Sequence, residues 1–263
     1  MTCRWNCRAM KMTYPEALSG SRSRPGRFYA CAETLKDDGL FVVALDAKVA
    51  KTPGGAKLGH RSRVLVDAIV EEWAQQGESI DIEAMSLTRL LTTAIDLNGE
   101  THAWRSRILN FLNTDTLCYR AVSPGALAHR QAEIWDPILT WFATYAGAEL
   151  ATTSSVIAID QARDALVAVE ELLADELPEV ILALRIISEA TGSAVLAFAR
   201  WQSAFPHHVI FDASMVEEEF QIQRWGRDEE AELRSSRVRT EFDAAGRFLD
   251  LVAGCPPAKA SQN

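Results

Sequence analysis

The sequence lacks both a long hydrophobic run and a set of paired cysteines. Its longest apolar stretch, residues 180–198, is interrupted by Arg185, Ser188 and Glu189. It falls short of the roughly 20 apolar residues that cross a bilayer, so membrane insertion is not expected. The cysteine count is odd and no C-x-x-C pair occurs, which predicts free thiols in a reducing compartment. These residues are Cys3, Cys7, Cys31, Cys118 and Cys255.

Signatures of catalysis and metal binding are missing as well. There is no G-x-x-x-x-G-K-[ST] phosphate loop, no H-E-x-x-H metal helix, and neither G-x-S-x-G nor G-x-G-x-x-G. The motif search for an active site is therefore mostly negative, and we name no catalytic residue and no metal ligand. The histidines do not combine with carboxylates at metal-ligand spacings. They are His60, His102, His129, His207 and His208.

Positive charge is scarce relative to negative charge. Lysine and arginine number 27 against 36 aspartates and glutamates, which gives a formal net charge of −9. A nucleic-acid partner would require a basic surface, and anionic lipid would repel an acidic one. The composition therefore favours a protein or a small molecule as partner.

Chain length and composition describe a globular protein with a substantial core. The 263 residues are 48% hydrophobic and 24% charged, which is enough for one and a half or two compact units. The first 27 residues are basic, with Glu16 as their one acid and no apolar segment, so they are not a secretory signal. A disordered tail and an organelle transit peptide both remain open for this region.

The part of the chain before about residue 104 has the pattern of a two-layer α+β unit. A small antiparallel meander begins it, with Asp37-Asp38-Gly39 supplying the first turn. Two amphipathic helices follow, and Ser62 caps the first of them. The predicted strands are 28–35, 40–46, 48–52 and 56–58, and the predicted helices are 62–76 and 86–97.

The remainder has an almost purely helical pattern and predicts a helical bundle. One further strand is predicted at 155–159, and Pro137 is expected to start a new helix or kink the old one. The predicted helices are 103–112, 126–134, 136–146, 161–175, 179–190, 193–204, 213–233 and 235–252. The predicted organisation is α+β: a disordered basic tail at 1–26, an N-terminal domain at 27–112, a bundle domain at 113–252 and a disordered tail at 253–263.

The most unusual segment, residues 217–231, is strongly acidic and contains a tryptophan. At about 100° per residue a helix here would align one polar stripe, made of Glu217, Gln221, Trp225, Asp228 and Glu232. Such a stripe suits protein recognition, because the aromatic ring provides contact area and the carboxylates attract arginines. The alternative is a solvated helix whose tryptophan packs into the bundle.

Other conspicuous residues have structural interpretations. Trp73 lies on the apolar face of its helix, and Trp135 and Trp141 bracket Pro137, so all three are expected to be mainly structural. Cys118 is interpreted as a buried thiol, since a nucleophilic cysteine would need a nearby base.

Several segments, taken in order, resemble the chaperone family that assembles the catalytic head of the ATP synthase by binding its alpha subunit, called assembly factor 2 in mitochondria. The resemblance covers about residues 27–250. Its motifs include Glu72-Trp73, Trp135-Asp136-Pro137 and Gln221 with Trp225-Gly226. The matching stretches are 27–29, 45–53, 72–77, 85–90, 93–96, 114–120, Gln131 with 135–137, 192–193, and Gln221 with 225–226 and Asp228.

The resemblance implies a small β-containing N-terminal domain followed by an orthogonal helical bundle, with no catalysis and no cofactor. It also implies that the chain binds the free alpha subunit until beta replaces it, and we expect the chain to be a monomer. An acidic residue before the Gln-x-x-x-Trp-Gly motif is implied to matter, and it maps onto Glu217 or Glu219 without a clear choice among the three glutamates. The implied partner-binding residues are Glu217, Glu219, Gln221, Trp225 and Asp228. The implied structural motif residues are Trp73, Asp96, Asp115, Arg120, Trp135 and Asp136. The motif at 225–231 resembles the bacterial branch, which implies bacterial cytoplasm, with the mitochondrial matrix as alternative.

Two rival functions remain open at this point. A small-molecule enzyme could use Asp115, Cys118 and Arg120 at a junction between the domains, where ligand sites are common. Burial of Cys118 and an Asp115–Arg120 ion pair would contradict that reading. A general interaction adaptor would bind many proteins without preferring alpha.

Overall fold

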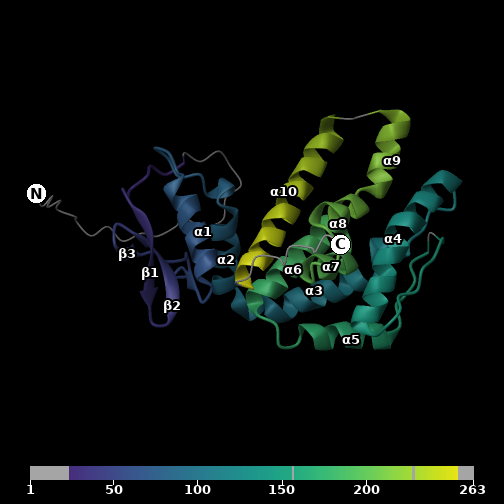
Figure 1. Cartoon of the computed structure of the whole chain (residues 1–263), viewed down its shortest axis with the longest axis horizontal. Helices are drawn as coiled ribbons and strands as arrows, with labels where there is room; N and C mark the ends of the chain where they lie inside the picture. Colours follow the sequence, from purple (N-terminus) through teal and green to yellow (C-terminus); the bar gives the residue numbers. More distant parts are fainter. Residues whose placement is uncertain (1–23, 156, 227–228, 254–263) are drawn as a thin grey trace, which may run out of the picture.

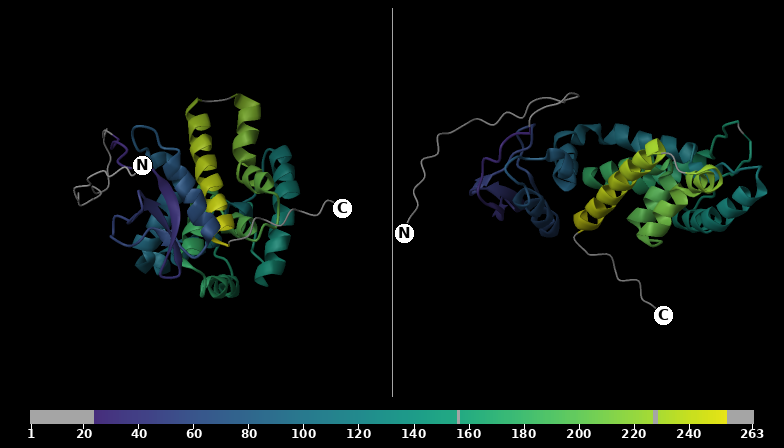
Figure 2. Two further views of the ribbon diagram at one scale, coloured as in Figure 1. Left: turned by 60° about the vertical axis from the view of Figure 1, so that its left-hand side comes forward. Right: turned by 90° about the horizontal axis from the view of Figure 1, so that it is seen from above.

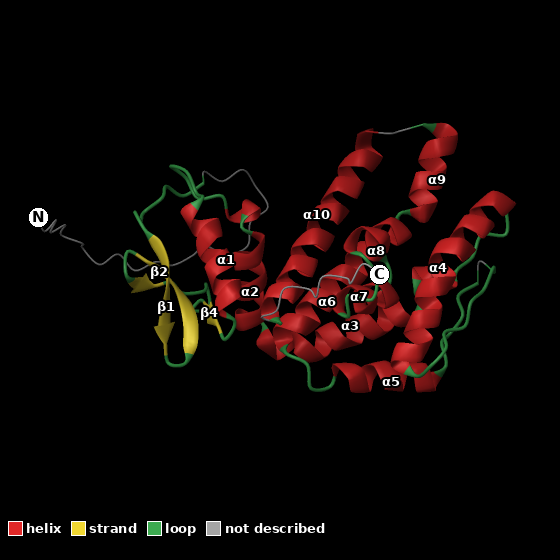
Figure 3. Cartoon of the chain, in the orientation of Figure 1, coloured by secondary structure: helices red, strands yellow, loops and turns green. Residues whose placement is uncertain are grey.

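The computed structural model describes residues 24–155, 157–226 and 229–253. A small sheet with two helices occupies one end of the molecule and a helical bundle the other, as Figure 1 shows. Figure 3 makes the same division by colour, with every named strand at the N-terminal end. The predicted α+β fold class is thus confirmed. None of the described helices combines the length and apolarity needed to cross a membrane.

The sheet is built around one central strand. β2 (Leu40–Leu45) pairs antiparallel with β1 (Ala32–Asp37) along one edge. Its other edge takes both β3 (Lys48–Val49) and β4 (Gly59–His60). Asp38 and Gly39 form the predicted turn, and both have positive φ, at 49° and 81°. This conformation is the one that two-residue hairpins favour.

Two helices complete the N-terminal unit. In α1 (Arg63–Ala74) the Ser62 hydroxyl accepts from the Leu65 N–H at 3.3 Å, so the predicted cap is present. The helix lays Leu65, Ile69 and other apolar residues against the sheet. The short 3₁₀ segment η1 (Ile82–Ala84) leads into α2 (Ser86–Asp96).

The helices of the bundle range from 8 to 24 residues in length. Two further 3₁₀ segments, η2 (Asn98–Glu100) and η3 (Thr116–Cys118), flank its first helix. The helices are α3 (Thr101–Asn113), α4 (Gly125–Ala146), α5 (Arg163–Leu173), α6 (Pro178–Thr191), α7 (Ala194–Trp201), α8 (His207–Ser214), α9 (Val216–Trp225) and α10 (Glu229–Val252).

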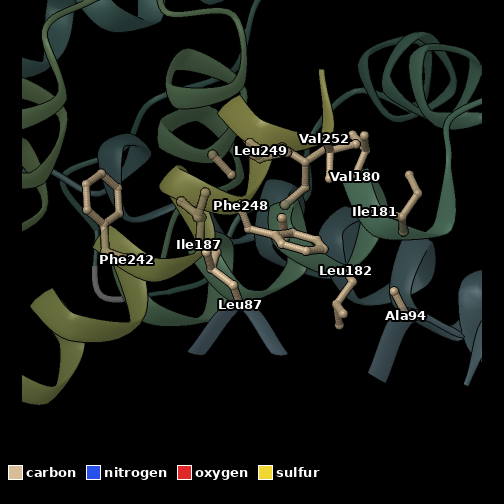
Figure 4. Close-up of a cluster of buried hydrophobic side chains, with 14 of the residues drawn as sticks. Leu87, Ala94, Val180, Ile181, Leu182, Ile187, Phe242, Phe248, Leu249 and Val252 are labelled. Atoms are coloured by element: carbon tan, nitrogen blue, oxygen red, sulfur yellow. The ribbon is translucent and has the colours of Figure 1, made fainter. Parts of the chain in front are cut away.

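The core is continuous across both units. In Figure 4 side chains of α6 such as Ile187 meet Leu87 of α2 and Phe248 of α10. The Ser62 hydroxyl also donates to the Leu251 carbonyl at 2.6 Å, which joins the start of α1 to the end of α10. The division into domains at residue 112 stays a prediction.

Several predicted elements differ from the structure. The fourth strand lies at Gly59–His60 and not at 56–58, where Lys57 makes only an isolated bridge to Lys51. Pro137 does not start a new helix, since α4 continues through it. Pro137 and Glu133, whose carbonyl loses its N–H donor, are both exposed residues, where water can replace the missing bond. The strand at 155–159 is wrong for its described residues: a single bridge between Tyr119 and Thr153 precedes it, and Val156 lies outside the described residues.

The helix predicted at 213–233 also differs from the structure. The chain forms the end of α8, then α9, then the beginning of α10. The α9 helix ends at Trp225 because Gly226 adopts φ 89° and ψ 174°, a conformation that other residues rarely take. The predicted stripe therefore cannot extend from Glu217 to Glu232 on one helix.

Candidate partner-binding site

The candidate site is centred on α9, which stands between α4 and α10. In Figure 1 and in the left view of Figure 2, α9 and the first half of α10 project from the bundle. Hydrogen bonds on both flanks support this placement: Glu219 of α9 reaches Arg130 of α4, and Glu218 reaches Ser235 of α10. A projecting helix of this kind presents one of its faces to the exterior.

The three consecutive glutamates of α9 have three different partners. Glu217 accepts from the Gln131 Nε2–H of α4 at 2.7 Å. Glu218 accepts from the Ser235 hydroxyl of α10. Glu219 forms an ion pair of 2.6 Å with Arg130. Sequence alone left the choice among them open, and the structure separates them by what each one touches.

The outward face of α9 carries polar residues and one large aromatic side chain. Gln221 and Arg224 are exposed, and the side chain of Trp225 is 75% exposed. Trp225 is therefore not packed into the bundle. Glu217, Gln221 and Trp225 do share the exposed side of the helix, as their spacing predicted. Asp228, the fourth predicted member, lies outside the described residues.

Some large apolar residues of the described chain are exposed. The four most exposed large ones are Trp225 at 75%, Ile157 at 73%, Val122 at 72% and Leu233 at 62%. Val122 precedes α4 by three residues, and Leu233 lies in the first turns of α10.

The α4 residues that hold α9 were not predicted as site residues. Gln131 was noted only as part of a motif, and Arg130 was not singled out. Gln131 is fully buried although it is polar, and its Oε1 accepts from the Ala121 N–H at 2.7 Å. Arg130 also donates to Gln223 at 3.2 Å. The sequence offered one signal, the position of Gln131 four residues before Trp135.

The residues proposed for an enzyme do not assemble into a catalytic group. Cys118 is buried, and its burial raises the pKa of the thiol to about 12, so it stays protonated. The Asp115–Arg120 ion pair, which would also have counted against an enzyme, is not formed. Arg120 forms a 2.6 Å ion pair with Asp136 and lies over the Trp135 ring. Cys118 and Cys31 are free thiols in the described chain, whereas Cys3, Cys7 and Cys255 lie outside it.

Asp115 serves the fold by capping a helix. Its carboxylate is completely buried and accepts from the Leu117 N–H at 3.1 Å and from the Val195 N–H at 3.0 Å. Val195 lies in the first turn of α7, where backbone N–H groups have no partner within the helix. Burial raises the pKa of the Asp115 carboxyl to about 6, although the hydrogen bonds from Val195, Ser193 and Leu117 oppose this shift.

The other motif residues also lie at structural junctions. Trp73 is buried, and its carbonyl accepts from the Tyr29 hydroxyl at 2.7 Å. Asp96 accepts from the Thr52 hydroxyl at 2.5 Å and from the Gly54 N–H at 2.8 Å, which fixes the loop after β3. Within the part of the chain that the structure describes, His, Cys, Asp and Glu side chains form no group of three or more that could hold a metal.

Known proteins share both the sequence and the fold. The family model for the ATP12 chaperone protein matches residues 26–143. The crystal structure of Atp12 from Paracoccus denitrificans is 34% identical, with a TM-score of 0.82. The match covers 87% of this chain and 98% of that one. The chain belongs to the ATP12 chaperone family.

Two further structures agree with this membership. A point mutant of the Paracoccus denitrificans protein is 34% identical with a TM-score of 0.83, covering 88% of this chain and 100% of that one. A candidate chaperone from Agrobacterium tumefaciens is also 34% identical, with a TM-score of 0.82, and the match covers 86% and 85% of the two chains. Membership in the ATP12 family confirms the resemblance to ATP synthase assembly chaperones that the motifs indicated.

Proposed function

We propose that this ATP12 family member holds the free alpha subunit of the F-type ATP synthase catalytic sector until beta replaces it. The observation that carries the proposal is the exposed tryptophan on a projecting helix of a chaperone-family protein. Trp225 on α9 is 75% exposed, so its ring is available to a partner, and covering it would remove apolar area from water. The proposed site of action is the bacterial cytoplasm, and the proposed form is a monomer.

The proposed mechanism is protection by mass action. An unassembled subunit exposes the surface meant for its neighbour, and such a surface is prone to aggregate. A chaperone that covers this surface lowers the concentration of the aggregation-prone species. Release requires only moderate affinity, which suits a contact built from one aromatic anchor and polar side chains.

Direct contact is assigned to the outward residues of α9. Gln221 and Trp225 are exposed and lie one helical turn apart. Trp225 would be the anchor and Gln221 would bond at the rim of the contact, because central aromatic residues carry most of the energy of protein interfaces. Asp228 remains a predicted member of this group. Glu217 and Glu219 have partners on α4, so their part is considered separately below.

The test is capture of co-expressed alpha subunit by the Trp225→Ala variant. Loss of a central aromatic anchor should weaken capture by at least about tenfold, whereas the free energy of unfolding should change by less than about 0.5 kcal/mol because the ring is exposed. The matched control is Val167→Ala, which removes an exposed apolar side chain from α5. Equal capture by the parent chain of alpha and of unrelated unfolded proteins would instead support a general adaptor.

A further inference from the structure

Two hydrogen bonds of similar length tie α4 to the segment formed by α8 and α9. The Gln131 Nε2–H donates to Glu217 at 2.7 Å, and the Trp135 Nε1–H donates to the Ala213 carbonyl at 2.8 Å. Gln131 and Trp135 are four residues apart on α4, and their partners Ala213 and Glu217 are also four residues apart. The two segments run in opposite directions. One helical turn of α4 therefore spans the junction between the end of α8 and the start of α9.

The hydrogen bonds of Gln131 determine what residue 217 must provide. Gln131 is fully buried, and its amide oxygen is occupied by the Ala121 N–H at 2.7 Å. Its amide nitrogen consequently points at Glu217, and a buried N–H requires an acceptor. The carboxylate of Glu217 supplies that acceptor. A side chain at 217 without an acceptor would leave a buried donor unpaired and weaken the attachment of α9.

Glu219, in contrast, is not bonded to a fully buried side chain. The ion pair of Glu219 with Arg130 is partly exposed, with 43% and 28% of the two side chains accessible, and surface pairs contribute little. Arg130 also keeps a second acceptor in Gln223. Of these two attachments of α9 to α4, only the one made by Glu217 ends on a fully buried polar side chain.

We infer that Glu217 and Gln131 are positioning residues for partner capture, and that Glu217 acts through Gln131 and not by contact with the partner. The pair fixes α9 on α4 so that Gln221 and Trp225 face outward together. This inference rests on the proposed function. It assigns the acidic residue before the Gln-x-x-x-Trp-Gly motif to Glu217 among the three glutamates.

The decisive comparison is between two substitutions of Glu217. Glu217→Gln removes the charge but keeps an oxygen that accepts from Gln131, so capture of alpha should stay within about twofold of the parent. Glu217→Ala removes the acceptor, and capture should fall by roughly tenfold. A carboxylate that met an arginine of the partner directly would make the two variants equally weak. That result would overturn the inference.

A double-mutant cycle tests the link to Gln131. Gln131→Met keeps a similar volume without the amide and should also weaken capture by roughly tenfold. The double variant Glu217→Ala with Gln131→Met should be no worse than the weaker single variant, because both break one attachment. Losses that multiply would show independent roles and contradict the inference. Glu171→Ala, an exposed glutamate on α5, is the control and should leave capture unchanged.

A measurement without the partner completes the test. Hydrogen exchange of the α9 amides should accelerate in Glu217→Ala and in Gln131→Met but not in Glu217→Gln. If the parent chain captures no alpha, the proposed function fails, whatever the exchange rates are. If the parent captures alpha and Glu217→Ala changes neither capture nor exchange, the positioning role alone fails.

Discussion

The indole N–H of Trp135 donates a hydrogen bond of 2.8 Å to the carbonyl oxygen of Ala213. Trp135 is buried in α4, and Ala213 lies in the last turn of α8, where carbonyl oxygens lack partners within the helix. One side chain thus satisfies a helix end and joins elements that are 78 residues apart. The motif around Trp135 that the sequence shares with assembly chaperones serves this junction.

Trp135→Phe should lower the free energy of unfolding by about 1–3 kcal/mol. The phenyl ring retains much of the apolar contact, but the Ala213 carbonyl loses its donor in a buried place. Urea unfolding followed by circular dichroism measures the change. A loss below about 0.5 kcal/mol would mean that the hydrogen bond contributes nothing net.

Glu72→Ala should destabilise the N-terminal unit, because Glu72 of α1 caps the neighbouring helix α2. The N-cap residue Met85 offers no acceptor. Instead the Glu72 carboxylate accepts from the backbone N–H groups of Leu87 and Thr88, both at 2.8 Å. Removing it should cost about 1–3 kcal/mol in urea unfolding. Glu71→Ala, an exposed neighbour on the same helix, should change stability by less than about 0.5 kcal/mol.

The buried carboxyl of Asp115 should make stability depend on pH. Its pKa is raised from 3.8 to about 6 by burial, so between these values the folded chain holds a proton that the unfolded chain has released. Stability from this group is therefore present at low pH and is lost as pH rises to about 6. The penalty above pH 6 amounts to about 3 kcal/mol.

Asp115→Asn provides the comparison, because asparagine stays neutral throughout this window. As pH rises from 4 to 6.5, the difference in unfolding free energy between variant and parent should move in favour of the variant by up to about 3 kcal/mol. Urea titrations at several pH values measure it. A difference that is independent of pH, or that moves towards the parent, would contradict the assignment.

Local signals in the sequence were enough for much of the fold. The Asp38-Gly39 pair identified the hairpin and Ser62 identified the start of α1, because turn and cap chemistry act within a few residues. Pro137 and Gly226 were harder to interpret. Whether a proline breaks a helix depends on the exposure of the carbonyl it leaves without a donor, which is a property of the folded molecule. Gly226 ended α9 inside a charged run where the polar pattern seemed continuous.

The site was only partly accessible from sequence. Helical spacing placed Glu217, Gln221 and Trp225 on one side, and the structure gives them that arrangement. The pairing of Gln131 with Glu217 could not be predicted, because it joins positions 86 residues apart that no local pattern links. Asp115 was noticed as part of a polar motif. Its role as a cap of α7 could not be predicted, because the Val195 N–H that it accepts from is 80 residues away in the sequence.

The last helix, α10, runs from the projection beside α9 into the interior, where it meets α6 and the N-terminal unit (Figure 1). Ser235 of α10 touches α9 near the surface, whereas Phe248 lies in the interior against α6 and α2, as Figure 4 shows. Its 24 residues give a length of about 36 Å. A client that grips the outer turns would therefore restrain the interior too. Client binding should therefore raise the melting temperature of the whole folded chain, and not only that of α9 and the outer turns of α10.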